Sequence, residues 1–138
     1  MLEPVKKLFD IKGPKVAEAL NKRHFEAYYC SDKESAVKKI LEIIPKNHSI
    51  AWGGCMTMDQ LELKDKLLAA GYSLIDRDAA KSPEERELIM HKALSCGSFI
   101  MSSNAITEDG QLFNIDGKGN RVAALIYGPE NVLIIAGM

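Results

Sequence analysis

Short apolar runs alternate along the chain with longer amphipathic stretches. This alternation is typical of β-strands separated by crossover helices, which join the strands into a largely parallel sheet. The sequence therefore predicts an α/β fold with about six strands. The expected strands comprise residues 25–30, 49–52, 73–76, 98–102, 111–115 and 132–136.

Local signals mark the ends of several expected helices. Ser82 can cap a helix, Pro83 suits the first helical position, and Glu85 can complete a capping box. A tight turn is expected at residues 109–110, where Asp is followed by Gly. Helices are expected at residues 14–23, 58–71 and 83–97, with a short helix through 123–126. A further helix is expected to be capped by Ser31 or Asp32 and to end before Pro45.

Length and composition indicate one globular unit. The chain has 138 residues, enough to bury a substantial core. Apolar residues make up 46% and charged residues 27%, both near the globular average, so disorder is not expected. We find no repeat or linker and predict a single domain over residues 1–138. The last expected strand ends two residues before the chain does, which suggests a C-terminally shortened homologue or a fragment.

Charge and cysteine content narrow the classes of partner and cofactor. The net charge of −1 gives no overall basic surface for nucleic acid, and because only the N-terminal segment leans basic, RNA binding is the weakest alternative. Cys30, Cys55 and Cys96 are widely spaced and form no C-x-x-C pair for zinc or an iron–sulfur cluster. No apolar run is long enough to span a membrane. We expect a cytoplasmic protein that itself binds no metal or cofactor.

Three polar loops, at residues 52–57, 104–108 and 116–121, follow expected strands. In open α/β sheets, ligands bind at the carboxyl ends of the strands, where helix N-termini favour anions. Gly53 and Gly54 can let the backbone approach an anion closely, and Thr57 can cap the next helix or bond a ligand oxygen. A tight strand-to-helix turn explains the two glycines equally well.

The third loop, Asp-Gly-Lys-Gly-Asn-Arg, gathers glycines, polar side chains and a guanidinium ahead of a helix. It matches neither the dinucleotide fingerprint nor the P-loop, so it is either an anion site or a glycine-rich connection with Arg121 in solvent. Asn104 and Ala105 open the second loop. The residues expected to bind a ligand are Gly53, Gly54, Thr57, Asn104, Ala105, Asp116, Gly117, Gly119, Asn120 and Arg121.

Candidate catalytic residues are Glu108, Asp116 and Cys55. Glu108 can act as an acid or base if burial raises its pKa. Cys55 stands at an expected helix N-terminus, where a lowered pKa would make its thiol a nucleophile. A small structural cysteine is the alternative, and Glu108 can equally face water. Asp76, Arg77 and Asp78 can form a local ion pair that supports the site.

Four segments stand out in order: 52–57 (Trp-Gly-Gly-Cys-Met-Thr), 74–78 (Leu-Ile-Asp-Arg-Asp), 104–110 (Asn-Ala-Ile-Thr-Glu-Asp-Gly) and 114–123 (Asn-Ile-Asp-Gly-Lys-Gly-Asn-Arg-Val-Ala). Together they resemble the lactate-utilisation (LUD) domain family, over about residues 15–137. Such domains are similar to ribose-5-phosphate isomerases, glucosamine-6-phosphate deaminases and CoA transferases. The resemblance implies a three-layer α/β/α sandwich with a mixed or parallel sheet of about six strands.

The resemblance also implies a cytoplasmic protein of lactate or 2-hydroxy-acid utilisation, with iron–sulfur clusters only in partner subunits. Related isomerases carry an acidic residue where Asn104 stands, so the resemblance implies a binding cleft more than an isomerase activity. Three hypotheses follow. The first is an accessory protein that binds a small anionic metabolite, a nucleotide or a CoA-like ligand. The others are an acyl-transfer or sugar-phosphate enzyme that uses Glu108 or Asp116, and an assembly subunit for iron–sulfur oxidoreductases; a homo-oligomer is compatible with each.

Overall fold

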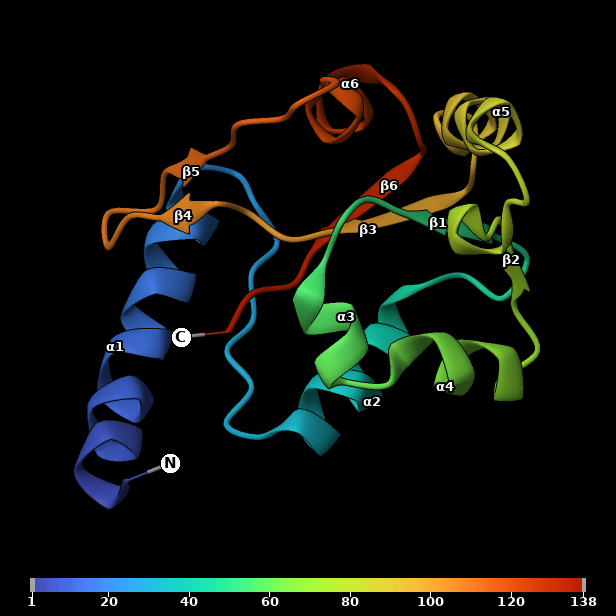
Figure 1. The fold of residues 1–138 in the computed structure, drawn as a ribbon. Helices are drawn as coiled ribbons and strands as arrows, with labels where there is room; N and C mark the ends of the chain where they lie inside the picture. The colour runs from blue at the N-terminus through green and yellow to red at the C-terminus, as the bar shows by residue number, and fades with distance from the viewer. Residues whose placement is uncertain (1, 138) are drawn as a thin grey trace.

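A computed structural model describes residues 2–137 of the chain (Figure 1). Its helices are α1 (Glu3–Lys22), α2 (Lys33–Ile43), α3 (Met56–Gln60), α4 (Leu63–Ala69), α5 (Pro83–Ala93) and α6 (Asn120–Tyr127), with a 3₁₀ turn η1 (Arg77–Ala79). Its strands are β1 (Ser49–Trp52), β2 (Ser73–Leu74), β3 (Ser98–Met101), β4 (Ala105–Ile106), β5 (Leu112–Phe113) and β6 (Asn131–Ile134).

Four strands form a parallel sheet in the order β2-β1-β3-β6. Ala51 of β1 pairs with Phe99 of β3, and Ile100 of β3 pairs with Leu133 of β6. Strands β4 and β5 form a separate antiparallel hairpin. The α/β fold with a mostly parallel sheet is therefore confirmed. Instead of one sheet of about six strands, the structure has a four-stranded sheet and a separate two-stranded hairpin.

Helices cover both faces of the parallel sheet (Figure 1). Ile50, Trp52 and Ile100 lie in one buried cluster with side chains of α2, α3 and α4. Ala51 and Phe99 lie in a second cluster with side chains of α5 and α6. This alternation follows from the strand geometry, because successive side chains point to opposite faces. It produces the three expected layers.

Helix α1 and the β4–β5 hairpin lie together beside the sheet (Figure 1). A helix was expected to begin only at Pro14, but α1 begins at Glu3 and runs through this proline. Contacts hold α1 on both sides of Pro14: Tyr29 donates a 2.7 Å hydrogen bond to Asp10, and the backbone of Gly110 packs against that of Ala19. These tertiary contacts outweigh the local break that proline introduces.

The expected strand at residues 25–30 is not a strand in the structure. The side chain of Asn21 takes up the backbone hydrogen bonds of Ala27: it accepts from the Ala27 N–H at 2.9 Å and donates to the Ala27 carbonyl at 3.1 Å. The segment therefore receives its hydrogen bonds from α1 instead of a sheet. The single helix expected over 58–71 is divided into α3 and α4 by Glu62, whose φ of 51° is left-handed.

The predicted helix caps are present. Ser82 accepts from the backbone N–H of Glu85 at 3.1 Å, and Asp32 accepts from that of Ser35 at 2.7 Å. The Glu85 carboxylate accepts from the N–H of Lys81, one residue before the cap. Within residues 2–137, no helix is both long enough and apolar enough to cross a membrane.

Candidate anion-binding site

Arg121, in the first turn of α6, lies at the centre of the predicted loops. Its side chain crosses directly over Gly53, where a Cβ would stand 2.6 Å from Arg121 Cγ. Any larger residue at this position would displace the arginine. Only 12% of the Arg121 side chain is exposed. Gly53 is therefore required by close packing, and its backbone is covered by Arg121.

Four hydrogen bonds tie the Arg121 guanidinium to the chain. Its Nε donates to Asp116 at 2.5 Å, and its Nη1 donates to the Ser102 carbonyl at 3.2 Å. Its Nη2 donates to Asn104 Oδ1 at 2.6 Å and to the Ile115 carbonyl at 3.0 Å. A guanidinium has five N–H donors, so at most one remains for a ligand. Arg121 is thus primarily the residue that joins the three loops.

Asp116 is the buried counter-ion of Arg121, with 5% of its side chain exposed. Burial acts to raise the pKa of this carboxyl, but the hydrogen bonds from the Val122 N–H and from Arg121 outweigh it, and the pKa lies below its usual range. Asp116 is therefore ionised near neutral pH with both oxygens engaged. This arrangement does not suit an acid–base catalyst.

A cleft of about 360 Å³ opens between α5 and the start of α6, beside the carboxyl ends of β1 and β2; we call it the α5–α6 cleft. Four of its lining residues are cationic and none is acidic. Its walls are Gly54, Arg77, Arg86, Met90, Gly117, Lys118, Asn120 and Arg121. Five of these eight residues belong to the loops that the sequence singled out.

Arg77 and Arg86 share a single carboxylate, that of Asp78, which lies outside the cleft lining. Asp78 Oδ1 lies 3.9 Å from Arg77 Nε and 3.6 Å from Arg86 Nη1. The other oxygen of Asp78 accepts the indole N–H of Trp52 at 3.1 Å. Desolvation by burial, and then the nearby Arg86, lower the pKa of Arg77. The wall therefore holds more positive charge than Asp78 balances.

The glycine loop before α6 forms the other wall. Lys118 donates to Glu87 of α5 at 3.0 Å, and because both side chains are well exposed this ion pair contributes little stability. Gly119 has a φ of 79°, a left-handed conformation that glycine adopts without strain. No atom lies within 4 Å of where a Cβ of Gly54 or Gly117 would stand. A ligand can therefore approach the backbone closely.

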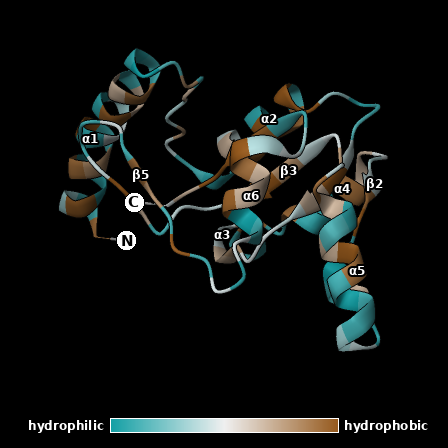
Figure 2. Ribbon diagram, turned by 90° about the horizontal axis from the view of Figure 1, so that it is seen from above, coloured by the Kyte–Doolittle hydropathy of each residue, from teal (hydrophilic) through white to brown (hydrophobic). Residues whose placement is uncertain are grey.

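Sequence reasoning missed Arg86 and Met90. They lie four residues apart on α5 and so share a helix face. Arg86 stands between glutamates and Met90 ends a short apolar run, and Figure 2 shows both teal and brown turns along α5. No sequence signal separates these two residues from an ordinary solvated helix. Arg77 was noticed, but only as a partner of the neighbouring aspartates.

The hairpin loop contributes less to the cleft than expected. Asn104 accepts from Arg121 and from the Ile115 N–H, and so acts through the arginine. Ala105 begins β4 and lies outside the cleft lining. Thr57 lies within α3 and does not cap it, since the cap is Cys55. The second loop is therefore joined to the site by Asn104 alone.

Glu108 lies away from the cleft, at the tip of the β4–β5 hairpin, with 76% of its side chain exposed. Lys12 of α1 donates to it at 2.8 Å. This hydrogen bond and the lysine charge lower the pKa of Glu108. The raised pKa that an acid–base role would require is absent, and the carboxylate faces solvent instead.

Cys55 stands at the N-terminus of the short helix α3, as expected, but its thiol is not activated. Burial raises the pKa of Cys55, and the backbone N–H groups of Met58 and Thr57 offset this only in part. The expectation of a lowered pKa is therefore wrong, because desolvation outweighs the helix N-terminus. The structure supports the alternative of a half-buried structural cysteine.

A serine, a histidine and a glutamate meet at the opposite, amino-terminal edge of the sheet. His48 Nδ1 lies 2.9 Å from Ser98 Oγ, and His48 Nε2 lies 3.1 Å from Glu130. Ser98 is 0% exposed, so no substrate can reach its hydroxyl. The trio joins β1, β3 and the start of β6 and has no access for chemistry.

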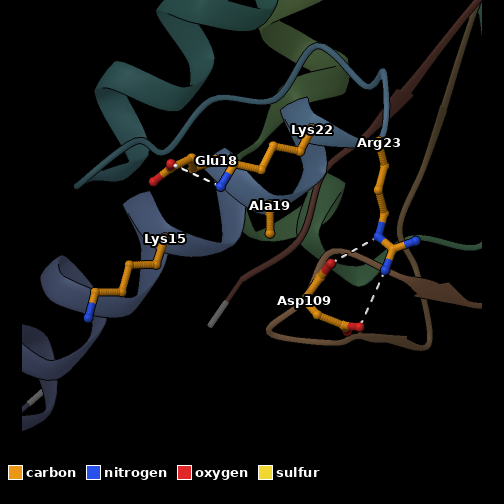
Figure 3. A pocket seen from close by; sticks show the side chains of 6 residues that line it. All are labelled: Lys15, Glu18, Ala19, Lys22, Arg23 and Asp109. Atoms are coloured by element: carbon orange, nitrogen blue, oxygen red, sulfur yellow. Dashed lines mark hydrogen bonds and ion pairs between the residues drawn. The ribbon is translucent and has the colours of Figure 1, made fainter.

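A second hollow lies between α1 and the turn of the β4–β5 hairpin (Figure 3). Its charges are mostly paired: Lys22 contacts Glu18, and Arg23 binds both the carbonyl and the carboxylate of Asp109. Lys15 extends away from Asp109. The α5–α6 cleft is therefore the better anion site of the two.

The side-chain chemistry of the chain bears on metals as well. Among residues 2–137, no three His, Cys, Asp or Glu side chains are grouped closely enough to hold a metal ion. The carboxylates nearest the cleft, Asp78, Glu87 and Asp116, each contact an arginine or a lysine. The donor set of the α5–α6 cleft suits an anion, since it consists of guanidinium, ammonium, amide and backbone N–H groups.

Comparison with known proteins identifies one match. The family model described as LUD domain matches residues 13–138. Among the curated proteins and the solved structures, no match to the chain is found. The family match includes β1 to β6 and every residue of the α5–α6 cleft. The chain therefore belongs to the LUD domain family.

Proposed function

We propose that this LUD-domain protein is an accessory protein of lactate or 2-hydroxy-acid utilisation that acts in the cytoplasm and binds a small anionic metabolite. Family membership supports the metabolic role. One observation carries the binding: the α5–α6 cleft is lined by four cationic side chains and no carboxylate. A concave site lined by charges of one sign concentrates ligands of the other sign.

The backbone of the cleft supports the same proposal. Gly54 follows β1, while Gly117 and Asn120 belong to the loop that enters α6. Free backbone N–H groups at a helix N-terminus attract anions, and the glycines leave them accessible. Arg121 holds both loops in place through Gly53 and Asp116. The cleft is therefore organised before a ligand arrives.

An enzyme that uses Glu108 or Asp116 is less well supported. Glu108 faces solvent beside Lys12, and both oxygens of Asp116 are occupied. Catalysis by proton transfer needs a group within hydrogen-bond reach of the substrate and with a pKa near the working pH. Neither carboxylate meets both conditions in this arrangement.

An assembly subunit is a second candidate, and one observation favours it. Tyr127 and Ile126 at the end of α6 are 96% and 76% exposed. Apolar and aromatic side chains exposed together are enriched in protein–protein interfaces. Affinity purification with an iron–sulfur oxidoreductase subunit as the prey would test this role. Capture that survives Ile126→Lys would count against it.

Isothermal titration calorimetry tests the proposed binding. Inorganic phosphate, pyrophosphate and L-lactate would be titrated into the wild type, into Arg77→Gln/Arg86→Gln, and into Lys38→Gln. Lys38 is an exposed residue of α2, on the opposite face of the sheet, and serves as the control for loss of a surface charge away from the cleft. We expect at least one anion to bind, with affinity reduced about tenfold or more by the arginine substitutions alone. Equal affinity in all three proteins would contradict the proposal.

A further inference from the structure

Arg77 and Arg86 in the wall of the α5–α6 cleft have donors that other described residues leave free. Only 16% of the Arg77 side chain is exposed, yet within residues 2–137 its guanidinium makes no hydrogen bond, and its nearest carboxylate, Asp78, is 3.9 Å away. No Arg77 nitrogen is both fully buried and without a partner, so its free N–H groups are open to solvent. They are therefore available to a ligand oxygen in the cleft.

Arg86 also has free donors, and 41% of its side chain is exposed. Its Nη1 lies 3.6 Å from the same oxygen of Asp78, beyond hydrogen-bond length, and the other Asp78 oxygen is held by Trp52. Asp78 therefore balances one positive charge where the wall carries two. Lys118 adds a third cation whose exposed pairing with Glu87 is readily exchanged.

A carboxylate ligand cannot bind all three cationic side chains of this wall. It brings two oxygens, enough for one guanidinium fork. A phosphate ester brings three acceptor oxygens and a charge of about −1.5 to −2 at neutral pH. Two guanidinium forks and an ammonium group match three oxygens. The number of donors therefore favours a phosphoryl group over the carboxylate of a 2-hydroxy acid.

The rest of the cleft has a different character. Met90 lies one helical turn after Arg86 on the same face of α5 and is the only apolar side chain in the lining. Thioether side chains pack against flat or apolar groups. A volume of about 360 Å³ lies within the range of roughly 300–1,000 Å³ typical of small-molecule sites, larger than a bare phosphate needs.

We propose that Arg77 and Arg86 form a phosphoryl subsite, and that the ligand is a phosphorylated small molecule whose organic part lies against Met90. This assignment rests on the proposed function, because it places the anionic end of the ligand in the same cleft. It predicts that the protein distinguishes a phosphate ester from a carboxylate of similar shape. Lys118 then leaves Glu87 and closes on the phosphoryl oxygens.

Calorimetry with paired probes tests the subsite. Phenyl phosphate, inorganic phosphate and benzoate would be titrated into the wild type, Arg77→Lys, Arg86→Gln, Met90→Ser and Lys38→Gln. We expect phenyl phosphate to bind at least tenfold more tightly than benzoate. Arg77→Lys keeps the charge but loses the planar fork, so we expect it to weaken both phosphate probes about tenfold. Met90→Ser should weaken phenyl phosphate and leave inorganic phosphate unchanged.

The outcomes separate this subsite from the broader proposal. Benzoate binding as tightly as phenyl phosphate, with both lost in Arg86→Gln, would overturn the phosphoryl subsite and leave an anion site in place. Phosphate binding that is equal in Arg77→Lys, Arg86→Gln and Lys38→Gln would indicate non-specific surface binding and overturn both. Thermal melting of each variant confirms that it is folded, and Arg77→Lys provides a mild change should another variant fail to fold.

Discussion

Replacement of Arg121 by methionine tests how the three loops are held together. Methionine preserves much of the apolar stem that packs over Gly53 but removes the guanidinium. Four hydrogen bonds disappear, and Asp116 keeps only the bond from the Val122 N–H. An ionised carboxylate with 5% exposure then has no counter-ion. The loops at 102–104 and 115–116 lose their common anchor.

The expected cost is large. Removal of one partner from a buried ion pair typically costs about 3–5 kcal/mol of the free energy of unfolding. A domain of this size has a stability of roughly 5–15 kcal/mol, so Arg121→Met should be folded but much less stable, with a melting temperature lower by roughly 10–20 °C. The double variant Arg121→Met/Asp116→Asn removes the stranded charge and keeps an acceptor for Val122. It should recover part of the loss.

The pH dependence provides a second readout with a defined sign. The pKa of Asp116 is lowered in the folded protein relative to about 3.9 in an unfolded chain. A lowered carboxyl pKa stabilises the fold above the unfolded value, and this contribution is lost as the pH falls through the folded value. The difference in stability between wild type and Arg121→Met should therefore be largest near pH 7 and shrink as the pH falls, because protonation relieves the unpaired Asp116 of the variant and because the wild type loses its contribution below about pH 4.

Urea denaturation monitored by circular dichroism, at pH 7 and in steps down to pH 3, measures both effects. Far-UV ellipticity reports the helices, and the single Trp52 gives an independent fluorescence signal. A loss below about 1 kcal/mol in Arg121→Met, with no recovery in the double variant, would refute the account of Arg121 as the buried anchor of the loops.

Three further predictions concern other parts of the chain. Ser82→Ala should lower the free energy of unfolding by about 1 kcal/mol, because the Glu85 N–H loses its acceptor, and thermal melting beside a Ser95→Ala control would detect it. Cys55 should react with iodoacetamide at pH 7 more slowly than a free cysteine, because burial raises its pKa; mass spectrometry of the labelled peptide would show the rate, and a faster rate would contradict the burial argument. Glu108→Gln should leave anion binding unchanged in calorimetry, since Glu108 lies at the hairpin tip. Loss of binding in this variant would show that Glu108 contributes to the site.

The layered fold could be predicted because its signals are local and repeated. The alternation in Ile50, Ala51 and Trp52 places side chains on both faces of a buried strand, and Ser82 marks the start of α5. The strand expected at residues 25–30 is absent because a side chain competes with strand pairing for its backbone hydrogen bonds. The Asn21 side chain takes the hydrogen bonds of Ala27, and apolar periodicity does not register such a contact.

The candidate site was predicted in outline but not in its charges. Glycines and Arg121 stand together in the sequence, so the loops could be predicted. The sequence does not show that the Arg121 guanidinium donates to Asp116, Asn104 and two backbone carbonyls. The cations left for a ligand, Arg77 and Arg86, come from other elements. They come together because α5 packs against η1, and they face the loop before α6 only in the folded chain.

Chemical-shift mapping by NMR can show directly whether the α5–α6 cleft binds anions. Inorganic phosphate would be added to ¹⁵N-labelled protein, and to Arg77→Gln, at constant ionic strength. We expect the amide signals of Gly54, Gly117, Lys118 and Asn120 to shift together with one dissociation constant, and these shifts to be lost in Arg77→Gln. Shifts confined to the hollow around Lys15 and Lys22, or unaltered by Arg77→Gln, would contradict it.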